Sequence, residues 1–549
     1  MSKHKKPNLV FIMSDQQRYD TLACYGNDWI NTPRLNELSE ESFVFENAYV
    51  TQPVCAPARS SIMTGLYPHT AGPIVNKIPL KKDTKSIADL IENEYTCGYL
   101  GKWHLGDDTV KQRGFDEWVS VEDLYKSSYY EGELPYSDLH KWLESKGHVP
   151  TGIGPTGNKV FSDEDRSMMP EDSQMSTFLS EKAEDFIDRN KDDSFVLYVS
   201  TFEPHSPYAG PLDGMYDPEK IPTGPTFLKE PNDVSNINKA RSAYHSSFLK
   251  GADQRSDHYM NNYLASRGED FSTREGWLKA RADYFANITL VDRMVGRIID
   301  SLKKNNLYED TILVFTSEHG EMMGDHGMLE KRTLYEESSK VPLLIKLPGV
   351  NGTQKKIKGS FGHIDLVPTL LSLMNQKQSD HLQGEDKSKS FETLNLYENV
   401  VVVEWNGTGE IDDRNLGTDE INKFNKNPRR SIIIDRMKLN LTLNDDGELF
   451  DLDLDPFEEK NLFHDEKYTE VIESMKNSLI KWQEINEDSS LTITLSDEDI
   501  DGDDLTFSAI DGNTSLIVNG NQLTITPEED FFGDVEISVS VTDLSLIHI

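Results

Sequence analysis

Residues 8–15, Asn-Leu-Val-Phe-Ile-Met-Ser-Asp, contain an unbroken apolar run that stops at a polar pair. A strand with apolar side chains at every position is buried on both faces, which is typical of a mostly parallel sheet covered by helices. Similar runs recur at residues 194–200, 311–316 and 341–345. The chain is therefore predicted to fold as an α/β domain around such a sheet.

The first three apolar runs each end in a polar cluster. These clusters are Ser14-Asp15-Gln16, Glu203-Pro204-His205 and Ser317-Glu318-His319. Because ligands of open α/β sheets sit at the carboxyl ends of the strands, we expect the clusters to converge in space. Between them, residues 284–302 show helical spacing of apolar side chains and predict a packed amphipathic helix without a catalytic role.

The composition limits the partners. A chain of 549 residues is long enough for two or three domains. Lys and Arg number 56 against 95 Asp and Glu, a formal net charge of −39, which argues against nucleic acid or anionic membrane as bulk partners. An anionic substrate would therefore need a locally cationic pocket.

The cysteines and the N-terminus carry information about the cellular location of the protein. Cys24, Cys55 and Cys97 cannot build a disulfide framework. The basic residues 1–7 lead into an apolar stretch too short for a signal peptide, without a small-residue cleavage site. No run of eighteen or more apolar residues predicts a transmembrane helix. By these criteria the expected location is cytoplasmic.

Two short motifs indicate the chemistry. Cys55-Ala56-Pro57-Ala58-Arg59 continues into Ser-Ser-Ile-Met-Thr-Gly and Tyr67-Pro68-His69, and Gly101-Lys102-Trp103-His104-Leu105-Gly106 follows later. Singly, a cysteine in apolar surroundings is usually a small buried hydrophobe, and a lone Lys or His in a polar loop is usually solvated. Together the motifs resemble those of the formylglycine-dependent sulfatases, in the alkaline-phosphatase-like superfamily.

The resemblance covers most of residues 8–465 and implies a mixed, mostly parallel sheet flanked by helices. It implies hydrolysis of a sulfate monoester. In the family a formylglycine-generating enzyme oxidises the motif cysteine, here Cys55, to formylglycine. One hydroxyl of the hydrated aldehyde attacks sulfur and the second ejects the sulfate afterwards.

The resemblance also implies a divalent cation beside residue 55. Its ligands would be Asp15, Gln16, Glu318, His319 and the modified Cys55. Calcium is expected, with magnesium or manganese as alternatives. Glu318 stands where the family usually has Asp, which leaves the metal or its geometry open. Taken alone, Asp15 after a strand would more often form an Asx turn.

Cationic groups are implied around the substrate. Lys102 and Lys331 would bind the sulfate, with Arg332 as the competing assignment for Lys331. Arg59 would contact the formylglycine. Asn76 is expected to touch the surroundings of the nucleophile and to contribute to substrate binding.

Two histidines are implied to move protons, a task that suits imidazole because its pKa lies near neutral pH. His104 would act as the base when the sulfate is eliminated. His205 would protonate the leaving oxygen and also contact the substrate. The alternative for His205, which lies in Pro204-His205-Ser206-Pro207, is a purely structural role in a rigid loop.

The C-terminal third differs in pattern. A polar, Lys-rich connector at residues 376–390 precedes predicted strands at 400–403 and 431–434, and residues 448–462 resemble the sulfatase C-terminal subdomain. After Lys481 there is no Lys or Arg, and alternation at 491–495, 505–510 and 535–541 predicts further strands. This last part resembles a bacterial cadherin-like or immunoglobulin-like repeat; an acidic linker is the alternative.

We therefore predict a catalytic domain at residues 1–375, a smaller α+β subdomain at 376–486 and a partial all-β module at 487–549. The acidic run 497–504 has oxygen ligands at alternate positions, as calcium requires, although such runs are more often simply solvated. An adhesion-like module indicates work outside the cell or in the periplasm, which conflicts with the N-terminal prediction.

The substrate is predicted least sharply. Two long excursions, residues 119–170 and 211–273, are the expected source of pocket walls and favour a carbohydrate sulfate. Choline sulfate or an aryl sulfate is the alternative. Gln16 and His319 also fit a phosphonate or phosphate monoester hydrolase on the same scaffold. From another class, the chain could be an inactive binding protein that acts through its acidic tail.

Overall fold

A computed structural model describes residues 6–92, 94–132, 134–257, 260, 269–350, 352, 354–407, 418–442, 447–483, 491–494, 506–510, 514–519, 522–527 and 538–542. The chain forms two compact units, Met1–Ile472 and Glu473–Ile549. The predicted division of the chain at residues 375 and 486 stays a prediction.

The main unit is built around a ten-stranded sheet. Its order is β12 (Asn395–Leu396), β11 (Lys355–Gly362), β2 (Phe43–Tyr49), β10 (Leu343–Lys346), β8 (Thr311–Ser317), β1 (Asn8–Ser14), β7 (Ser194–Ser200), β3 (Tyr95–Gly101) and β4 (Glu117–Ser120), with β9 (Lys340–Val341) paired to β2. Only the pairings of β10 and β9 are antiparallel. The predicted mostly parallel sheet is confirmed, although the apolar run at 341–345 is divided between β9 and β10 at Pro342.

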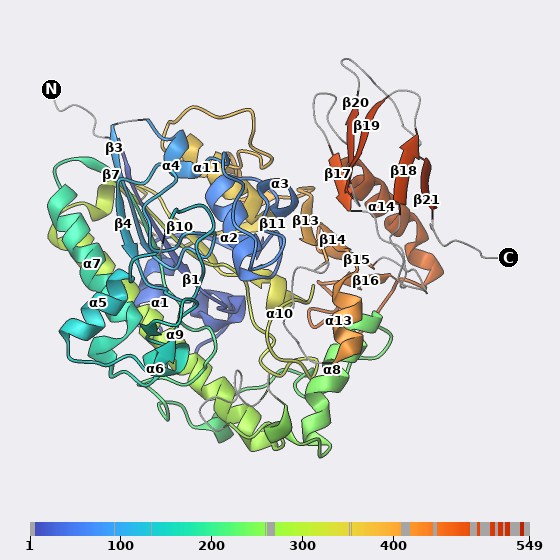
Figure 1. Cartoon of the computed structure of the whole chain (residues 1–549), viewed down its shortest axis with the longest axis horizontal. Coiled ribbons are helices and arrows are strands. Elements are labelled where there is room, and N and C mark those ends of the chain that lie inside the picture. The colour runs from blue at the N-terminus through green and yellow to red at the C-terminus, as the bar shows by residue number, and fades with distance from the viewer. Residues whose placement is uncertain are drawn as a thin grey trace. The chain divides into compact units, whose positions relative to one another are not determined.

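Helices cover both faces of this sheet, as Figure 1 shows. On β1, Leu9, Phe11 and Met13 enter the core beneath α2 (Cys55–Thr64) and α11 (Leu366–Leu373). Val10 and Ile12 enter the opposite core, which α1 (Pro33–Glu40), α7 (Met175–Asn190) and α9 (Arg274–Lys304) cover. Residues 9–13 of the strand are all apolar because both of its faces are buried. The helix predicted at 284–302 is the C-terminal part of α9.

The two excursions carry short elements of their own. The first contains α5 (Asp138–Ser145), β5 (Gly152–Ile153), β6 (Lys159–Val160) and α6 (Asp163–Ser167), and the second contains α8 (Asn236–Leu249). The remaining helices are α3 (Pro68–Ala71), α4 (Ile87–Leu90), α10 (Glu336–Ser339), α12 (Ser390–Thr393), α13 (Asp419–Asn425) and α14 (Thr469–Gln483).

A smaller antiparallel sheet follows within the main unit. It has the order β13 (Val401–Trp405), β14 (Arg429–Ile434), β15 (Met437–Thr442) and β16 (Glu448–Asp451). Asp435 and Arg436 form the turn between β14 and β15, with φ angles of 44° and 69°. Two left-handed residues are what a two-residue hairpin turn with a right-handed twist requires.

Among its described residues, the second unit contains the C-terminal part of α14 and strands that pair only in antiparallel fashion. β17 (Leu491–Thr494), β20 (Gln522–Pro527) and β19 (Thr514–Asn519) form one sheet, and β18 (Thr506–Ile510) and β21 (Ser538–Thr542) form another. The predicted all-β module is confirmed, while the acidic run 497–504 falls outside the described residues. Across the described parts of both units, no helix is both long and apolar enough to cross a membrane.

Candidate active site

The three polar clusters meet at the carboxyl ends of β1, β7 and β8. These strands are adjacent, with β1 in the middle and both pairings parallel. Past the strand ends, the Asp15 amide donates to Glu203 O at 3.3 Å and the Glu318 amide donates to Ser14 O at 3.1 Å. The sequence positions 15, 205 and 318 are thereby brought to one edge of the sheet.

Four buried side chains at this edge form a potential metal site. One ligand atom from each of Asp15, Cys55, Glu318 and His319 lies within 4.8 Å of all the others. His319 Nε2 lies 3.3 Å from Cys55 Sγ, 3.2 Å from Glu318 Oε1 and 3.8 Å from Asp15 Oδ1. Among the described residues no donor reaches the buried Asp15 Oδ1. Carboxylate oxygens and an imidazole fit a divalent cation.

Gln16 is engaged differently from the other predicted ligands. Its Oε1 accepts a hydrogen bond from Lys331 Nζ, and its Nε2 donates to Glu321. Its backbone is left-handed, with φ of 68°, and Tyr284 Oη donates to its carbonyl at 2.7 Å. The carboxamide therefore joins the metal candidates to Lys331, and its ligand role stays a prediction.

Two buried cations balance the carboxylates. Lys102 Nζ lies 2.6 Å from Asp15 Oδ2, and the Arg59 guanidinium forms an ion pair with Glu318. Burial alone would raise the pKa of Asp15, but Lys102 and its other positive neighbours hold that pKa well below its usual range. Arg59 Nη1 also donates to Lys102 O at 2.6 Å and to Ser200 Oγ at 2.8 Å, so one arginine fixes both motifs.

The N-terminus of α2 presents Cys55. Cys55 is the first residue of this helix and is 1% exposed, while Val54 before it provides no side-chain cap. Asn76 Oδ1 instead accepts a hydrogen bond from the Ala56 amide at 3.1 Å. A residue twenty positions away thus satisfies one of the free N–H groups at the helix start, the usual task of an N-cap.

His205 and Lys331 form a pair. Lys331 Nζ lies 3.0 Å from His205 Nε2, and His205 Nδ1 lies 2.6 Å from the Ser206 carbonyl. The carbonyl can only accept, so the proton belongs on Nδ1 and Nε2 accepts from Lys331. Burial first and Lys331 second hold the pKa of His205 well below its usual value. Arg332 Nη1 donates to Glu330 Oε2 at 3.1 Å, which favours Lys331 as the residue that faces the site.

His104 lies in a loop that contacts the first excursion, residues 119–170. Its ring packs on Tyr125 with centroids 4.7 Å apart, and its amide donates to Asp108 Oδ1 at 2.6 Å. Burial raises the pKa of Asp108 to about 6. The carboxylate of Asp107, in the same loop, accepts from the Ser128 and Tyr129 amides at 2.7 and 2.9 Å. The motif loop and residues 125–129 therefore form one structure.

Several buried residues here were not among those predicted. The Phe202 ring lies 4.6 Å from Lys102 Nζ and 4.5 Å from the His205 ring. Glu122 lies near Lys102, and burial raises the pKa of its carboxyl to about 7 despite that lysine. Phe202 and Ser200 stand at the end of an apolar run, a signal that could have marked them. Nothing in the local sequence marks Glu122 or Tyr125.

Comparison with known proteins agrees with this geometry. The sulfatase family model matches residues 7–376, and a bacterial Ig domain model matches residues 476–545. The chain belongs to the sulfatase family, and with it to the sulfuric ester hydrolases. The predicted immunoglobulin-like resemblance of the C-terminal module is confirmed as well.

Three similar proteins illustrate the range of relatives. The uncharacterized sulfatase YidJ of Escherichia coli is 27% identical over 87% of this chain and 88% of its own. An ulvan-active sulfatase of Formosa agariphila is 30% identical over 70% of this chain and 65% of its own. The crystal structure of a phosphonate monoester hydrolase of Agrobacterium radiobacter superposes with a TM-score of 0.66 at 23% identity, covering 87% of this chain and 95% of that one. That last likeness shows the shared fold.

Proposed function

We propose that this protein hydrolyses a sulfate monoester on a saccharide, with a formylglycine formed from Cys55 by a maturing enzyme and with a bound Ca²⁺. The observation that carries the proposal is the buried cluster of Asp15, Cys55, Glu318 and His319, flanked by Lys102 and Arg59. Anionic ligands for a cation and fixed positive charges for an anionic ester are combined at one helix N-terminus.

Residue 55 and the cation define the reacting centre. A formylglycine there would supply a hydrated aldehyde, in which one hydroxyl attacks sulfur and the other permits release of the sulfate. A divalent cation held by Asp15, Gln16, Glu318 and His319 would polarise the sulfate oxygens and lower the pKa of a neighbouring hydroxyl. Arg59, which bridges Glu318 and the Lys102 carbonyl, would hold the ionised form of that hydroxyl.

The chain's own cations neutralise the ester. Lys102 and Lys331 approach from different loops and would bind the equatorial sulfate oxygens, where negative charge accumulates in the transition state. Both ammonium groups are buried and already oriented, Lys102 by Asp15 and Lys331 by Gln16 and His205. Little reorganisation is then needed when the ester enters.

Proton transfer falls to the two histidines. Because Lys331 donates to His205 Nε2, the pair shares one proton. When the sulfate draws Lys331 toward its oxygens, His205 Nε2 would take up a proton from water and deliver it to the leaving oxygen. His104, held by Asp108 and Tyr125, would accept the proton of the second hydroxyl.

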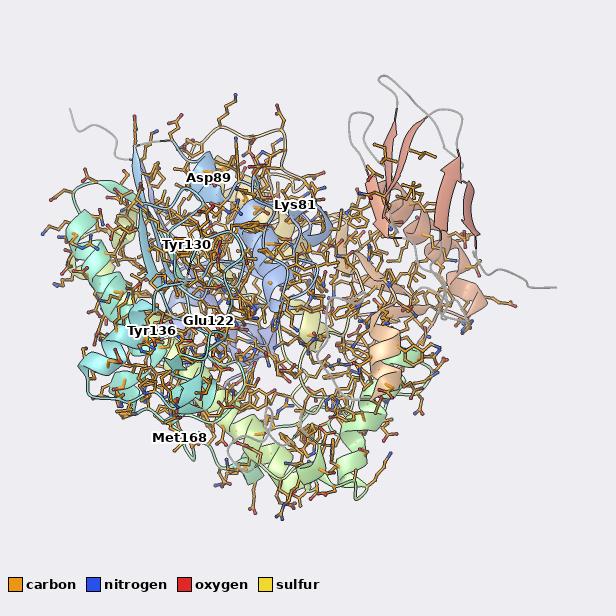
Figure 2. The ribbon with its side chains drawn as sticks, in the orientation of Figure 1. Lys81, Asp89, Glu122, Tyr130, Tyr136 and Met168 are labelled. Atoms are coloured by element: carbon orange, nitrogen blue, oxygen red, sulfur yellow. The ribbon has the colours of Figure 1, made fainter. Side chains whose placement is uncertain are left out.

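A saccharide is favoured as the leaving group. The loop that packs on His104 continues into Tyr129 and Tyr130, which are 45% and 44% exposed. Glu122 and Tyr130, both from the first excursion, are marked in Figure 2. An exposed aromatic face suits a sugar ring, because the C–H groups of the sugar can pack on it. The ulvan-active relative and the bacterial Ig domain match support a polysaccharide outside the cell or on its surface.

The test has a chemical and a catalytic arm. Mass spectrometry of the tryptic peptide that carries Cys55, from a host with a maturing enzyme, should show formylglycine. The same preparation should release sulfate from members of a panel of sulfated saccharides, and Cys55→Ala should not. An unmodified thiol without turnover would instead favour a binding protein, and full activity of Cys55→Ser would refute the proposed nucleophile.

A phosphonate or phosphate monoester hydrolase is the second candidate. The pair of Gln16 and His319 beside the carboxylates favours it, because neutral groups lower the negative charge around the cation. Matched aryl sulfate and aryl phosphonate esters separate the two candidates, since a clear preference in kcat/KM for the phosphonate would overturn the sulfatase assignment of the site.

A further inference from the structure

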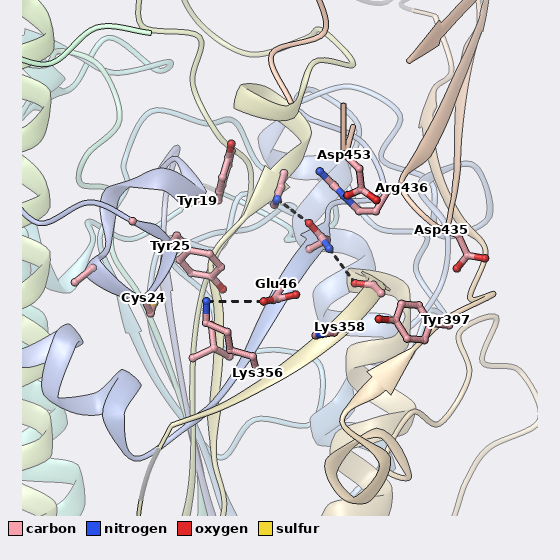
Figure 3. Close-up of a pocket in the computed structure, with 16 residues that line it drawn as sticks. Tyr19, Cys24, Tyr25, Glu46, Lys356, Lys358, Tyr397, Asp435, Arg436 and Asp453 are labelled. Atoms are coloured by element: carbon pink, nitrogen blue, oxygen red, sulfur yellow. Dashed lines mark hydrogen bonds and ion pairs between the residues drawn. The ribbon is translucent and has the colours of Figure 1, made fainter. Parts of the chain in front are cut away.

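A pocket of about 720 Å³ lies over strands β2 and β11 of the main unit. Figure 3 shows it from close by. None of the residues assigned above to the candidate active site lines it. Val44, on the pocket side of β2, belongs to the core under α7 and α9, whereas Phe45 and Ile357 face the core under α2. The pocket is therefore on the sheet face opposite to the helix that carries Cys55, and its volume is in the range of small-ligand sites.

The lining has a small excess of positive charge, and this excess lies on β11, because Lys340 and Arg436 both pair with the buried Glu336, at 3.7 and 3.6 Å. Cationic side chains outnumber carboxylates by one, the cations being Lys340, Lys356, Lys358 and Arg436 and the carboxylates Glu46, Asp435 and Asp453. Lys356 and Lys358 are two residues apart on β11 and both line the pocket, although the register of β11 against β2 shifts between Ile357 and Ser360. Lys356 pairs with Glu46 at 3.8 Å, whereas Lys358 Nζ has no ion-pair partner within the described ranges.

The rest of the lining is fixed in place. Lys340, 6% exposed, donates to Asn47 Oδ1 at 2.8 Å and lies 4.4 Å from the centre of the Tyr19 ring. Arg436 is held by the Leu452 carbonyl at 3.0 Å and by Asp453 at 3.4 Å. Its left-handed backbone belongs to the β14–β15 hairpin turn, which fixes the position of its Cα at the pocket.

An aromatic side chain completes the rim. Tyr397 follows β12 and is 58% exposed. The neighbouring backbone is tied to the β14–β15 turn, because the Glu398 amide donates to Asp435 Oδ1 at 2.7 Å. Figure 3 shows Tyr397 and Lys358 on the same side of the pocket, beyond the Glu46 and Lys356 pair. An exposed aromatic face next to an unpaired ammonium group suits a ligand that carries both a ring with C–H groups and an anion.

We propose that this pocket is a second, non-catalytic binding site for a sulfated saccharide chain. Lys356 and Lys358 would contact successive sulfate groups, and Tyr397 would pack on a sugar ring between them. The proposal rests on the proposed function for the class of ligand, since the polymer that carries the cleavable ester also carries the sulfates for this pocket. Such a site would hold a long substrate on the enzyme between turnovers.

Two charge-reversed variants of the full chain test the site. Lys358→Glu places a carboxylate in the pocket, and Lys355→Glu makes the same change on the same strand but on the other face, where Lys355 lies 5.0 Å from the Phe43 ring. Binding is measured by retardation in native gels that contain heparin, fully desulfated heparin or double-stranded DNA. We expect Lys358→Glu to weaken heparin binding about tenfold, the effect of losing one charge-assisted contact, and Lys355→Glu to weaken it less than twofold. Tyr397→Ala should act in the same direction as Lys358→Glu.

A kinetic arm separates this site from the catalytic one. Lys358→Glu should leave kcat/KM for a small aryl sulfate unchanged and should raise KM for a sulfated polymer. Equal heparin binding by the Lys358→Glu and Lys355→Glu variants would overturn the proposal, and so would equal loss of heparin and DNA binding, which would mean a general polyanion surface. If no sulfate ester is hydrolysed but Lys358 still controls heparin binding, the proposed function fails and this site stands.

Discussion

Asp15 Oδ2 lies 2.6 Å from Lys102 Nζ, and both side chains are buried. The other oxygen, Oδ1, points into the cluster with Glu318 and His319. A single carboxylate thus joins the first strand of the fold, the lysine of the second motif and the candidate metal site. Neither charge could remain buried without the other, because an isolated buried ion costs several kcal/mol.

Lys102→Met should remove most activity, and because it leaves the buried Asp15 carboxylate without its nearest cation it should also lower the unfolding free energy by about 3–5 kcal/mol. Methionine keeps the length of the side chain but not the positive charge, and loss of one oriented donor for a transition-state anion typically costs about 10²–10³ in kcat. Steady-state kinetics with an aryl sulfate, together with circular dichroism as a check on folding, measures the effect. Lys111→Met, on an exposed lysine of the next turn, is the control and should retain activity. Similar kcat values for the two variants would contradict the assigned role.

Asn76 offers a test of positioning, because its side chain accepts a hydrogen bond from the first turn of α2. Asn76→Ala leaves the Ala56 amide without its acceptor and should cost about 1 kcal/mol of stability, as loss of an N-cap does. Because the first turn of α2 carries residue 55, we expect kcat to fall more than KM rises. Asn76→Asp keeps an acceptor and should restore most of the loss.

A matched control for Asn76 is Thr273→Ala in α9. Thr273 Oγ1 accepts from the Gly276 amide at 3.1 Å and caps a helix whose N-terminus carries no predicted catalytic residue. This variant should lose similar stability and keep its kcat. A parallel loss of kcat in both variants would mean that the effect at Asn76 is only one of stability.

The strand ends could be predicted from the sequence, but the side-chain partners could not. The strands at 8–14, 194–200 and 311–317 have unbroken apolar centres because both sheet faces are covered, and that pattern is local. Gln16 was predicted only as a ligand because nothing local reveals that Lys331, more than three hundred residues later, donates to it. Glu122 and Tyr125 escaped prediction for the same reason, since their partners lie in another loop.

His363 should make stability fall with acid. Its ring is buried with Nε2 3.1 Å from Thr316 Oγ1, and burial lowers its pKa to about 3. Above pH 6.5 the histidine is neutral in both the folded and the unfolded chain, so its titration does not change the free energy of unfolding. Between pH 6.5 and pH 3 only the unfolded chain takes up the proton, and the folded state loses about 2 kcal/mol by pH 5.

The variant for this test is His363→Gln, which can still hydrogen-bond Thr316 but cannot titrate. Denaturant unfolding at pH 8 and pH 5 should show a wild-type advantage at pH 8 that shrinks or reverses at pH 5. A difference in unfolding free energy that does not change with pH would show that His363 is protonated or solvated in the folded chain.

Arg59→Lys should be costly although it keeps the charge. The guanidinium contacts Glu318, the Lys102 carbonyl and Ser200 at once, which a single ammonium group cannot reproduce. Leaving Glu318 partly unpaired in a buried site should cost about 3 kcal/mol of unfolding free energy. Arg189→Lys, at an exposed ion pair with Glu117, should cost less than about 1 kcal/mol. Equal costs would mean that water reaches Arg59.

Calcium should stabilise the folded chain through Asp15. A ligand at about one hundred times its Kd adds about 3 kcal/mol, because it binds the folded state only. Thermal unfolding of the chelator-treated protein with and without added Ca²⁺ measures that gain. Asp15→Asn lowers the negative charge of the site and frees Lys102, so its metal-free stability should fall as well, and the informative quantity is the Ca²⁺-dependent shift alone. That shift should be small for Asp15→Asn and full for Asp310→Asn, which changes an exposed aspartate before β8. If Ca²⁺ stabilises Asp15→Asn and the wild type equally, the ion binds elsewhere. Asp15 Oδ1 would then need another partner.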